Sequence, residues 1–403
     1  MAQRIVIVGS GFAGMWAALS AARARAMAGR DGGSVEIVVV SPDAAIVIRP
    51  RLYETAFEQM APRLEPVFEV AGVRHVAGHV QRIDTAARAV EIEDAVCRRT
   101  TLVYDRLVLA SGSSMFLPEV QGLIEHSFNV DQLDGAIALD RHLRALAQRP
   151  ESLARNTVVV AGGGFTGIET AAEMPERLRA ILGTAADTRV IVLEQADAIG
   201  PDLGPGPRPV IDQALRELGV EVRTGATVTA VDEGGATING SERIASNTVI
   251  WTAGLRASGL AGQVPGKHDR YGRLHVSRNL QVQGVNDVFA TGDVAFAATD
   301  DAGNHAMMSC QHAMGLGRSA GHNAAADLLG LPPAPYSQPK YVTCLDLGPW
   351  GAVYTEGWER EVKMVGAAAK ALKRDINTLW IYPPEGDREA IFAAADPARV
   401  VVA

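Results

Sequence analysis

Short runs of aliphatic residues alternate along the chain with glycine-rich turns and stretches of small and apolar residues. The first run, residues 4–8, is followed by Gly-Ser-Gly-Phe-Ala-Gly at residues 9–14, and the second, residues 157–161, by Gly-Gly-Gly-Phe-Thr-Gly at residues 162–167. Unbroken aliphatic runs of this length are typical of strands that are buried on both faces of a parallel sheet. The pattern therefore predicts two strand, turn and helix units of the same design.

Both glycine clusters have the spacing of a turn that holds a dinucleotide. The first glycine allows the tight turn, the second lets backbone approach a pyrophosphate, and the third lets the helix pack closely on the strand. The N–H groups at the start of the helix then face the phosphates. The residues expected to hold the two nucleotides are Gly9, Gly11, Phe12, Ala13 and Gly14 in the first unit, and Gly162, Gly164, Phe165, Thr166 and Gly167 in the second.

The end of the second strand distinguishes the two units. Residues 34–40 and 188–193 are the predicted strands, and Ser41 and Glu194 follow them, each 32 residues after the first glycine of its unit. A carboxylate at this place accepts hydrogen bonds from the ribose hydroxyls and repels a 2′-phosphate, so Glu194 favours NADH over NADPH. Ser41 places a hydroxyl where an acid is expected, which leaves the ribose contact to Asp43 or to water.

Further strands flank the two units. Residues 104–113 form an aliphatic run that ends in Ala110, Ser111 and Gly112, and residues 247–254 repeat this plan and end in Ala253 and Gly254. Both segments are expected crossing points between domains. Residues 280–293 predict a turn, a strand and then Gly292-Asp293 at the head of a helix, where the carboxylate could bind a hydroxyl-bearing chain along the sheet edge.

The size and the charge of the chain limit its function. With 403 residues, 47% of them hydrophobic and 41 of them glycine, the chain has material for two or three α/β domains. A net charge of −8 argues against nucleic acid as a partner. We find no export signal and no apolar run long enough to span a bilayer, and we expect a cytoplasmic protein.

The cysteines and the other reactive residues show no pattern of their own. Cys97, Cys310 and Cys344 are widely spaced, without a CxxC or a zinc-type motif, and are expected to be reduced. We find no nucleophile motif, no acid–base pair and no metal cluster. Such a sequence suits chemistry that a bound cofactor performs.

The C-terminal part has a different pattern. Residues 307–329 have small and apolar positions at helical spacing and are expected to pack under a cofactor, and residues from 340 to 354 alternate like strands. Residues 361–382 predict a helix with a basic flank that Pro383-Pro384 ends. Its apolar face could lie on an anionic membrane surface at residues 365–382, or dock on the chain's own core or on a second subunit. That predicted face comprises Val365, Ala369, Leu372, Ile376 and Leu379, and Lys370, Lys373 and Arg374 are predicted to lie off it.

The chain resembles the flavoproteins with two dinucleotide-binding domains, and among them the type II NADH dehydrogenases. The two glycine motifs, RPRLYE at residues 49–54, YDRLVLASGS from residue 104, IWTAG from residue 250 and VFATGD ending at Asp293 support this resemblance. It implies an α/β fold in which an NADH domain, residues 119–254, is inserted into an FAD domain, residues 1–118 and 255–332. Residues 333–403 would then form a small α+β region for interface or membrane-surface docking.

The resemblance also implies roles for single residues. Asp293 and Arg49 would lie against FAD, together with the residues around the first glycine turn, and Glu169 would approach the nicotinamide and the flavin, where it can relay protons or position the ring. Quinone-reducing relatives have two glutamines in an AQxxxQ-like segment. Here Gln311 keeps the first, and Gly315 replaces the second. Gln311 is expected at the flavin or the acceptor, and His312 is expected to be a satisfied helix histidine.

These observations favour an FAD-dependent NADH dehydrogenase that passes two electrons to a quinone without a redox-active disulfide. The missing cysteine pair disfavours disulfide reductases and sulfide:quinone oxidoreductases. Two alternatives stay open: a soluble NADH-dependent flavin reductase for a carrier protein or a biosynthetic intermediate, and a redox-responsive signalling protein that binds FAD and NADH. We expect contact with the inner face of the membrane to be peripheral at most, and a homodimer is possible.

Overall fold

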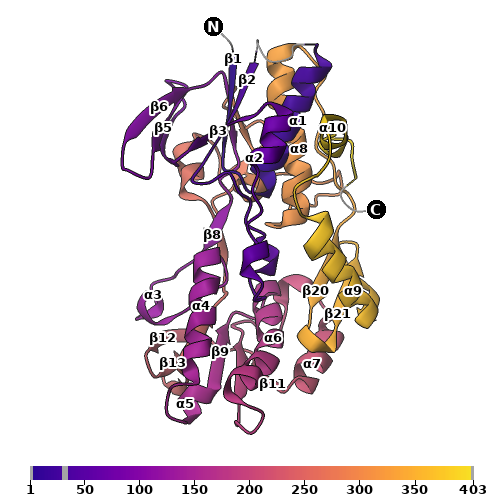
Figure 1. Ribbon diagram of the computed structural model, residues 1–403. Helices are drawn as coiled ribbons and strands as arrows, with labels where there is room; N and C mark the ends of the chain where they lie inside the picture. Colours follow the sequence, from indigo (N-terminus) through magenta and orange to yellow (C-terminus); the bar gives the residue numbers. More distant parts are fainter. Residues whose placement is uncertain (1–2, 30–34, 401–403) are drawn as a thin grey trace.

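The computed structural model describes residues 3–29 and 35–400 and shows an elongated molecule with one sheet in each half (Figure 1). The first sheet has five parallel strands in the order β18-β7-β1-β2-β3. Its strands are β18 (Val288–Ala290), β7 (Arg106–Leu109), β1 (Gln3–Val8), β2 (Val35–Ser41) and β3 (Arg74–Ala77). Residue 34, with which we predicted the second strand to begin, lies outside the described residues.

Two long helices pack against each other beside the first sheet. They are α1 (Phe12–Met27), which follows the first glycine turn, and α8 (Cys310–Leu329), which corresponds to the predicted helix at residues 307–329. A Cβ added to Gly317 would lie 2.4 Å from the carbonyl oxygen of Ala13, and one added to Gly321 would lie 1.9 Å from that of Ala17. The two helices therefore touch backbone to backbone.

The second half of the molecule repeats the plan. Its parallel sheet has the order β11-β10-β9-β15. The strands are β11 (Val220–Arg223), β10 (Arg189–Leu193), β9 (Thr157–Ala161) and β15 (Thr248–Trp251). Helices α6 (Phe165–Leu182), α4 (Leu133–Leu146) and α7 (Arg208–Glu217) belong to this half. Every residue of β9 is buried, which agrees with the continuous aliphatic run in the sequence.

The chain crosses between the halves twice. Strand β8 (Ser113–Met115) leads out of the first half and pairs antiparallel with β16 (Leu255–Ala257), which leads back. The returning chain then adds β18 to the edge of the first sheet beside β7. The predicted fold class is therefore confirmed: two Rossmann-like domains, with the second inserted in the first. The boundaries proposed at residues 118, 254 and 332 stay predictions.

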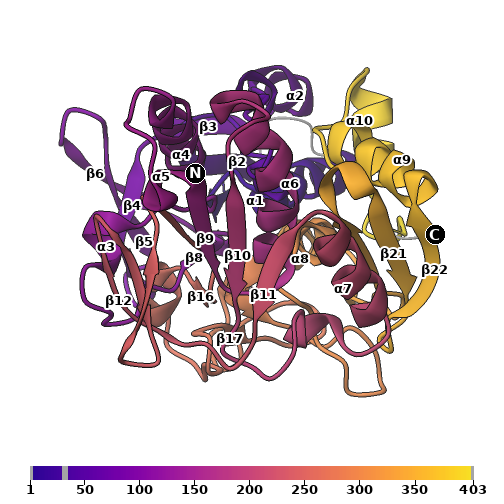
Figure 2. The ribbon, with the colours of Figure 1, turned by 90° about the horizontal axis from the view of Figure 1, so that it is seen from below.

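Three antiparallel sheets of three strands complete the fold. One is formed by β4 (His79–Asp84), β5 (Ala89–Glu93) and β6 (Arg99–Val103), and another by β12 (Val228–Asp232), β13 (Gly235–Ile238) and β14 (Glu242–Ala245). The third belongs to the C-terminal region and consists of β20 (Val342–Asp346), β21 (Ala352–Glu356) and β22 (Glu361–Gly366). Seen from below, β21, β22 and the following helix α9 (Ala367–Asp375) lie together at one side of the molecule (Figure 2).

The C-terminal region corrects one prediction. We predicted a helix over residues 361–382, but residues 361–366 form β22, and the helix begins only at Ala367. A turn of π-helix (Ile376–Trp380) continues it, and a further helix, α10 (Arg388–Ala394), follows the two prolines. Strand pairing with β21 overrides the helical spacing at Val365, because tertiary pairing outweighs local pattern.

A second correction concerns the end of β18. We predicted that Gly292-Asp293 begins a helix, but residues Gly292–Val294 form a single 3-10 turn, and α8 starts only at Cys310. No helix in the described part of the chain has both the length and the apolar character that crossing a bilayer requires.

Candidate active site

The two glycine turns have nearly the same geometry. Gly9 and Gly162 have φ angles of +104° and +117°, which side chains rarely adopt. A Cβ on Gly14 would lie 1.9 Å from the carbonyl oxygen of Gly9, and one on Gly167 would lie 1.8 Å from that of Gly162. These positions therefore require glycine for the turn and for helix packing.

The middle glycines of the turns differ from their neighbours. A Cβ on Gly11 or on Gly164 would meet no atom within 4 Å. These glycines serve no packing need of the protein itself, and each stands at the N-terminus of a long helix, α1 or α6. The open space above each turn therefore fits the backbone approach of a pyrophosphate. Phe12 and Ala13 lie in the first turn of α1, and Phe165 and Thr166 in the first turn of α6.

The carboxyl edge of the first sheet has unpartnered polar atoms. The hydroxyls of Ser111 and Thr291, which follow β7 and β18, are buried and have no hydrogen-bond partner among the described residues. Buried polar groups without partners are rare in folded proteins and point to a missing ligand or water. Ala110 is buried beside the first glycine turn, and Gly112 and Gly292 have positive φ angles. These groups fit a flavin nucleotide laid along this edge.

Asp293 lies at the same edge and is held by two neighbours. Ser113 donates a hydrogen bond of 2.6 Å to Asp293 Oδ2, and Arg49 Nη1 lies 3.7 Å from the same oxygen. Arg49 also forms an ion pair with Asp131 and donates to the Asp131 carbonyl oxygen. Arg49 thus joins Asp293 to the segment that leads into the second domain, and the two residues predicted for the flavin site lie close together.

The ribose ends of the two units differ as the sequence predicted. Glu194 is buried, and its two carboxylate oxygens accept hydrogen bonds of 2.8 Å from the N–H groups of Gly163 and Ala196. Its carboxylate therefore lies beside the second glycine turn. The Ser41 hydroxyl lies 2.7 Å from the Asp43 carbonyl oxygen and 2.9 Å from a ring nitrogen of His75. It is therefore held within its own loop.

A cavity of about 390 Å³ lies next to Ser41, at the carboxyl ends of β2 and β3. Pro42, Gly78, His79 and residues 94–96 line it, together with Ala77 and Arg98. The cavity continues the line from the first glycine turn past Ser41, so its place fits the adenosine end of a dinucleotide.

In the second unit, the residues that follow β15 pack tightly against Gly162, the first glycine of the turn. An added Cβ on Gly162 would lie 2.9 Å from the backbone nitrogen of Ala253, and the Thr252 hydroxyl lies 3.0 Å from the Gly162 carbonyl oxygen. Gly254 has a φ angle of +81° and lies against Phe116 at the crossing between the domains. Thr252 was not among the predicted site residues.

Glu169 is the most unusual ionisable group of the site. It lies on α6 two residues after the last glycine, is 3% exposed, and its Oε1 lies 2.8 Å from Lys373 Nζ and accepts a 3.0 Å hydrogen bond from the Asp346 N–H. Burial raises the pKa of Glu169 to about 7, against the opposing effect of the Lys373 ammonium group. This carboxyl can therefore both bind and release a proton near neutral pH.

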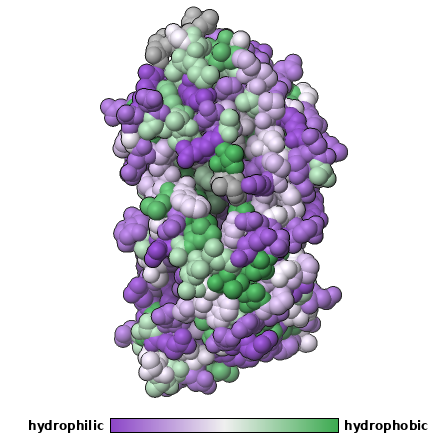
Figure 3. All heavy atoms as spheres, turned by 90° about the vertical axis from the view of Figure 1, so that its right-hand side faces the viewer, coloured by the Kyte–Doolittle hydropathy of each residue, from purple (hydrophilic) through white to green (hydrophobic). Residues whose placement is uncertain are grey.

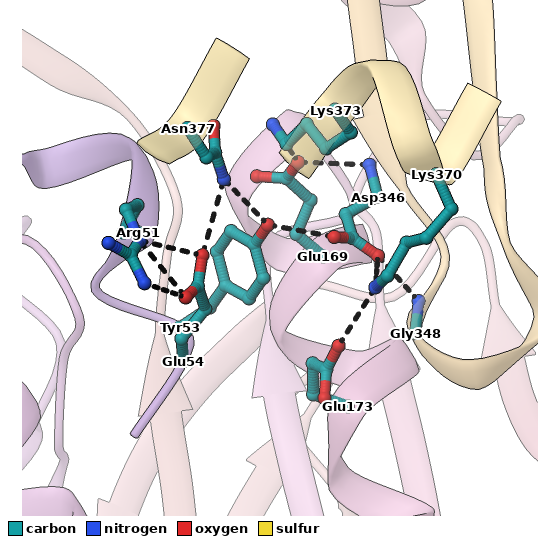
Figure 4. Close-up of polar contacts among 10 residues, drawn as sticks. All are labelled: Arg51, Tyr53, Glu54, Glu169, Glu173, Asp346, Gly348, Lys370, Lys373 and Asn377. Carbon is teal, nitrogen blue, oxygen red and sulfur yellow. Dashed lines mark hydrogen bonds and ion pairs between the residues drawn. The ribbon is translucent and has the colours of Figure 1, made fainter. Parts of the chain in front are cut away.

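Side chains from four parts of the chain surround Glu169 (Figure 4). Asp346, at the end of β20, accepts hydrogen bonds of 3.0 Å from the Tyr53 hydroxyl and 2.5 Å from Lys370 Nζ. Lys370 also lies 3.6 Å from Glu173, which is one helical turn after Glu169 on α6. Burial raises the pKa of Tyr53 well above its ordinary value. Tyr53 therefore keeps its proton and acts as a donor.

Most of this network has no signal in the sequence. Lys370 and Lys373 were predicted to lie off the apolar face of a C-terminal helix, but both point inward, and Lys373 is 5% exposed. Their spacing of three residues, the same as one helical turn, is the only local hint that they act together. Asp346 lies in a strand turn without a motif, and Tyr53 lies within the RPRLYE segment, of which only Arg49 was predicted as a site residue.

Gln311 and His312 lie at the start of α8. The Gln311 amide donates to the Val342 carbonyl oxygen at 3.2 Å and accepts from Gln338 at 3.3 Å, so it fastens the segment at residues 338–342 that leads into β20. His312 is buried and stacks on Tyr341, and burial lowers its pKa to about 3. Its Nδ1 accepts a hydrogen bond of 3.1 Å from the Met307 N–H, but its buried Nε2 has no partner among the described residues, so the expectation of a satisfied histidine is wrong for that atom.

The cysteines and the side chains that could bind a metal form no second reactive site in the part of the chain that the structure describes. Cys97, Cys310 and Cys344 are free. Burial raises the pKa of the Cys310 thiol to about 11 and that of Cys344 to about 12, so neither favours a thiolate. Within residues 3–29 and 35–400, no three His, Cys, Asp or Glu side chains are grouped to hold a metal ion.

The fold and the two open glycine turns define a two-domain α/β protein of the class that binds two dinucleotides. Residues 3–317 match the family of pyridine nucleotide-disulphide oxidoreductases. A match over most of the chain shows membership, and the chain belongs to this family. FAD and a nicotinamide nucleotide are the cofactor and the substrate expected of such an oxidoreductase, and the two turns described above fit them.

Two relatives and one solved structure are similar to this chain. A NADH dehydrogenase-like protein of Mycobacterium tuberculosis is 48% identical over 397 residues, which cover 98% of both chains. A type II NADH:quinone oxidoreductase of the same species is 31% identical over 319 residues, covering 72% of this chain and 67% of the relative. The structure of NDH2 from Plasmodium falciparum in complex with NADH has the same fold, with a TM-score of 0.77, 13% identity and coverage of 98% and 97%.

Proposed function

We propose that the protein is an FAD-dependent NADH dehydrogenase that passes two electrons to a quinone. The first unit, with the open turn at Gly11 and the acid Asp293, would hold FAD, and the second unit, with Glu194 at the ribose end, would bind NADH. The 31% identical relative named as a type II NADH:quinone oxidoreductase supports this assignment. When bound in the first unit, FAD would supply the chemistry of accepting a hydride and passing on two electrons, which no side chain can supply.

The protonation state of Glu169 is the observation that carries the proposal. Oxidation of NADH releases one hydride, whereas reduction of a quinone to a quinol takes two electrons and two protons. One proton per turnover must therefore come from solvent. Glu169 is buried, has a pKa raised to about 7 by burial, and follows the second glycine turn. It is suited to hold and deliver that proton.

Rapid-mixing kinetics test the proposal in two steps. The holoprotein is first mixed with NADH or NADPH while flavin absorbance is followed, and the reduced protein is then mixed with a soluble quinone. We expect fast reduction by NADH, slower reduction by NADPH because of Glu194, and fast reoxidation by the quinone. Reduction by NADH without reoxidation by any quinone would refute the quinone assignment.

One feature favours the alternative of another acceptor. Gly315 stands where quinone-reducing relatives are expected to have a second glutamine, and the Gln311 amide is bonded to Val342 at the start of β20. The same rapid-mixing experiment with a panel of acceptors, including small redox proteins, separates the two functions. A quinone that fails where a protein carrier succeeds would favour the soluble reductase.

We further propose peripheral contact with a membrane surface through the C-terminal region. Because Lys370 and Lys373 point inward, the outer side of this region keeps apolar residues: Met364, Val365, Leu379 and Trp380 are 36%, 46%, 66% and 59% exposed. Apolar patches gather on the face of the molecule that carries these elements (Figure 3). Exposed Arg374 and Lys363 are near in sequence and could meet anionic lipid headgroups.

Vesicle binding tests the surface. Leu379 and Trp380 are replaced together by serine, and co-sedimentation with vesicles containing anionic lipid is compared with that of the wild type. Binding should fall about 10-fold or more, since two large apolar side chains no longer enter the interface. Unchanged vesicle binding, or a variant that shifts only from dimer to monomer in size-exclusion chromatography, would show that this face contacts something else.

A further inference from the structure

Asp346 shares the buried pocket of Glu169 but has a very different set of partners. Its Oδ1 accepts from Lys370 Nζ at 2.5 Å and from the Gly348 N–H at 2.9 Å, and its Oδ2 accepts from the Tyr53 hydroxyl at 3.0 Å. Three donors thus surround this one carboxylate. Within residues 3–29 and 35–400, Glu169 by contrast is contacted by Lys373 and by a single backbone N–H, and that N–H belongs to Asp346.

Two carboxyl groups in one dry pocket repel each other, and their environments decide which one is protonated. Asp346 has three donors, whereas Glu169 has the Lys373 ammonium group and one backbone N–H, so the two carboxyl groups differ in their surroundings. Asp346 also fixes the position of Glu169 directly, because its N–H donates to Glu169 Oε1 at 3.0 Å. Burial is the main cause that raises the pKa of Glu169, and the charge of Asp346 adds to it.

We propose that Asp346 is a positioning residue for Glu169: its backbone N–H orients the Glu169 carboxyl, and its charged side chain makes Glu169 the group of this site that binds a proton. This inference rests on the proposed function, in which Glu169 delivers the solvent proton to the acceptor. Lys370 takes part in the same interaction. Its positive charge neutralises Asp346 and thereby weakens the effect of Asp346 on proton binding by Glu169.

Several other charged or titratable groups face the Glu169 carboxyl from the elements packed against it. They are Lys370 and Lys373 from α9, Asp346 and Cys344 from β20, Tyr53 and Glu54 from the segment after residue 48, and Glu173 from α6 itself. Lys373 pairs with Glu169 directly, so its replacement would break the centre. Asp346 and Lys370 can be changed while that pair stays intact.

The electrostatic role predicts shifts of opposite sign for these two residues. In Asp346→Asn the backbone N–H stays and one negative charge is lost, so the pH midpoint of the proton-requiring step should fall by about 1 pH unit. In Lys370→Met the charge of Asp346 is no longer neutralised, so the midpoint should rise, by about half a unit or more. A purely structural role would loosen the same pocket in both variants and move both midpoints in one direction.

The experiment measures two half-reactions of the holoprotein over a range of pH. Reduction by NADH transfers a hydride and takes no proton from solvent, so its rate should stay within about 2-fold of wild type in both variants. Reoxidation by a soluble quinone takes up the proton, and its pH midpoint should shift as stated. Asp140→Asn is the matched control, because it makes the same acid-to-amide change at an ion pair with Arg177, two helical turns after Glu169 on α6. This variant should leave both half-reactions unchanged.

A second measurement does not depend on turnover. Infrared difference spectra across the pH range report the carboxylic-acid band of a buried carboxyl, and Glu169→Gln identifies the part that belongs to Glu169. The midpoint of this band should fall in Asp346→Asn and rise in Lys370→Met. Equal midpoints in all variants, or shifts in the same direction, would overturn the inference while leaving quinone reduction by the wild type intact. A wild type that reduces no quinone would instead refute the proposed function, and with it the proton delivery.

Discussion

The two nucleotide units share one scaffold and use equivalent positions differently. The offset of 153 residues that relates Gly9 to Gly162 also relates Trp16 to Glu169. In the first unit, the Trp16 ring packs under the Arg318 guanidinium of α8 at 4.1 Å, whereas in the second, Glu169 pairs with Lys373 of α9 at 2.8 Å. The same helical position thus holds a packed indole in one domain and a buried, lysine-paired carboxyl group in the other, and the partner helix makes the difference.

The strand ends show the same division. Ser41 is bonded within its own loop, while Glu194 lies against the second glycine turn. The glycines themselves do not differ, because both turns have the same open position and the same close contacts. The turn therefore determines that a dinucleotide binds, and residues beyond the turn determine which one and what happens to it.

The largest effect is expected where a methyl group has no room. Gly14→Ala places a Cβ 1.9 Å from the Gly9 carbonyl oxygen and should destabilise the protein by about 3 kcal/mol or more. Gly11→Ala meets no atom within 4 Å, so it should fold with a change in the free energy of unfolding below about 0.5 kcal/mol but lose FAD. Thermal unfolding and flavin content measure the two effects. Equal destabilisation by both variants would contradict the separate roles of the two glycines.

The next effect compares the equivalent residues of the two helices. Glu169→Gln should slow quinone-dependent reoxidation by about 100-fold, the usual loss when a proton-transferring group is removed. Trp16→Phe removes an indole whose N–H has no partner among the described residues and should leave both half-reactions within about 2-fold, at a stability cost of about 1 kcal/mol. Rapid mixing and chemical unfolding measure these values. A Trp16 variant as slow as Glu169→Gln would remove the contrast between the units.

A smaller effect is expected at the ribose ends. Glu194→Gln should raise the KM for NADH by about 10-fold and narrow the preference over NADPH, because a charge-assisted hydrogen bond to the ribose is lost. Ser41→Ala removes a hydroxyl that is bonded to its own loop, so FAD affinity should change by about 3-fold or less. Steady-state kinetics and FAD titration measure the pair. A larger loss at Ser41 would show that this hydroxyl contacts the ribose after all.

The last prediction is the pH dependence of stability. The folded-state pKa of Glu169, about 7, exceeds its ordinary value of 4.5, so between these values the folded protein binds a proton that the unfolded chain does not. Stability from this group is therefore present at low pH and falls as pH rises through that window, by at most about 1.4 kcal/mol per pH unit. Urea unfolding of wild type and Glu169→Gln gives the difference. Subtracting one unfolding curve from the other removes the contribution of other groups. One of these is His312, whose lowered pKa makes stability rise with pH instead.

The sequence predicted the parts of this molecule that repeat a local pattern. Both glycine turns, β9, α8 and the difference between Ser41 and Glu194 follow from spacing and residue type, because each depends on neighbours within one strand, turn and helix. The surroundings of Glu169 depend on three distant segments, which carry Tyr53, Asp346 and Lys373. No local pattern places Lys373 beside residue 169, and its helical spacing with apolar neighbours suggested a solvent-facing lysine. Strand β22 was missed for the same reason, since its pairing with β21 lies outside the helical window.

The contact of α1 with α8 through Gly317 and Gly321 has a consequence for how this architecture can change over time. One helix starts at the first nucleotide turn and the other at Cys310, beside Gln311, so backbone contacts and the Trp16–Arg318 contact fasten the two starting points together. An added side chain at Gly317 or Gly321 would have to push the helices, and with them the two starting points, apart. Asp346, Lys370 and Lys373 lie on segments outside this helix pair, so changes around them leave the pair itself intact.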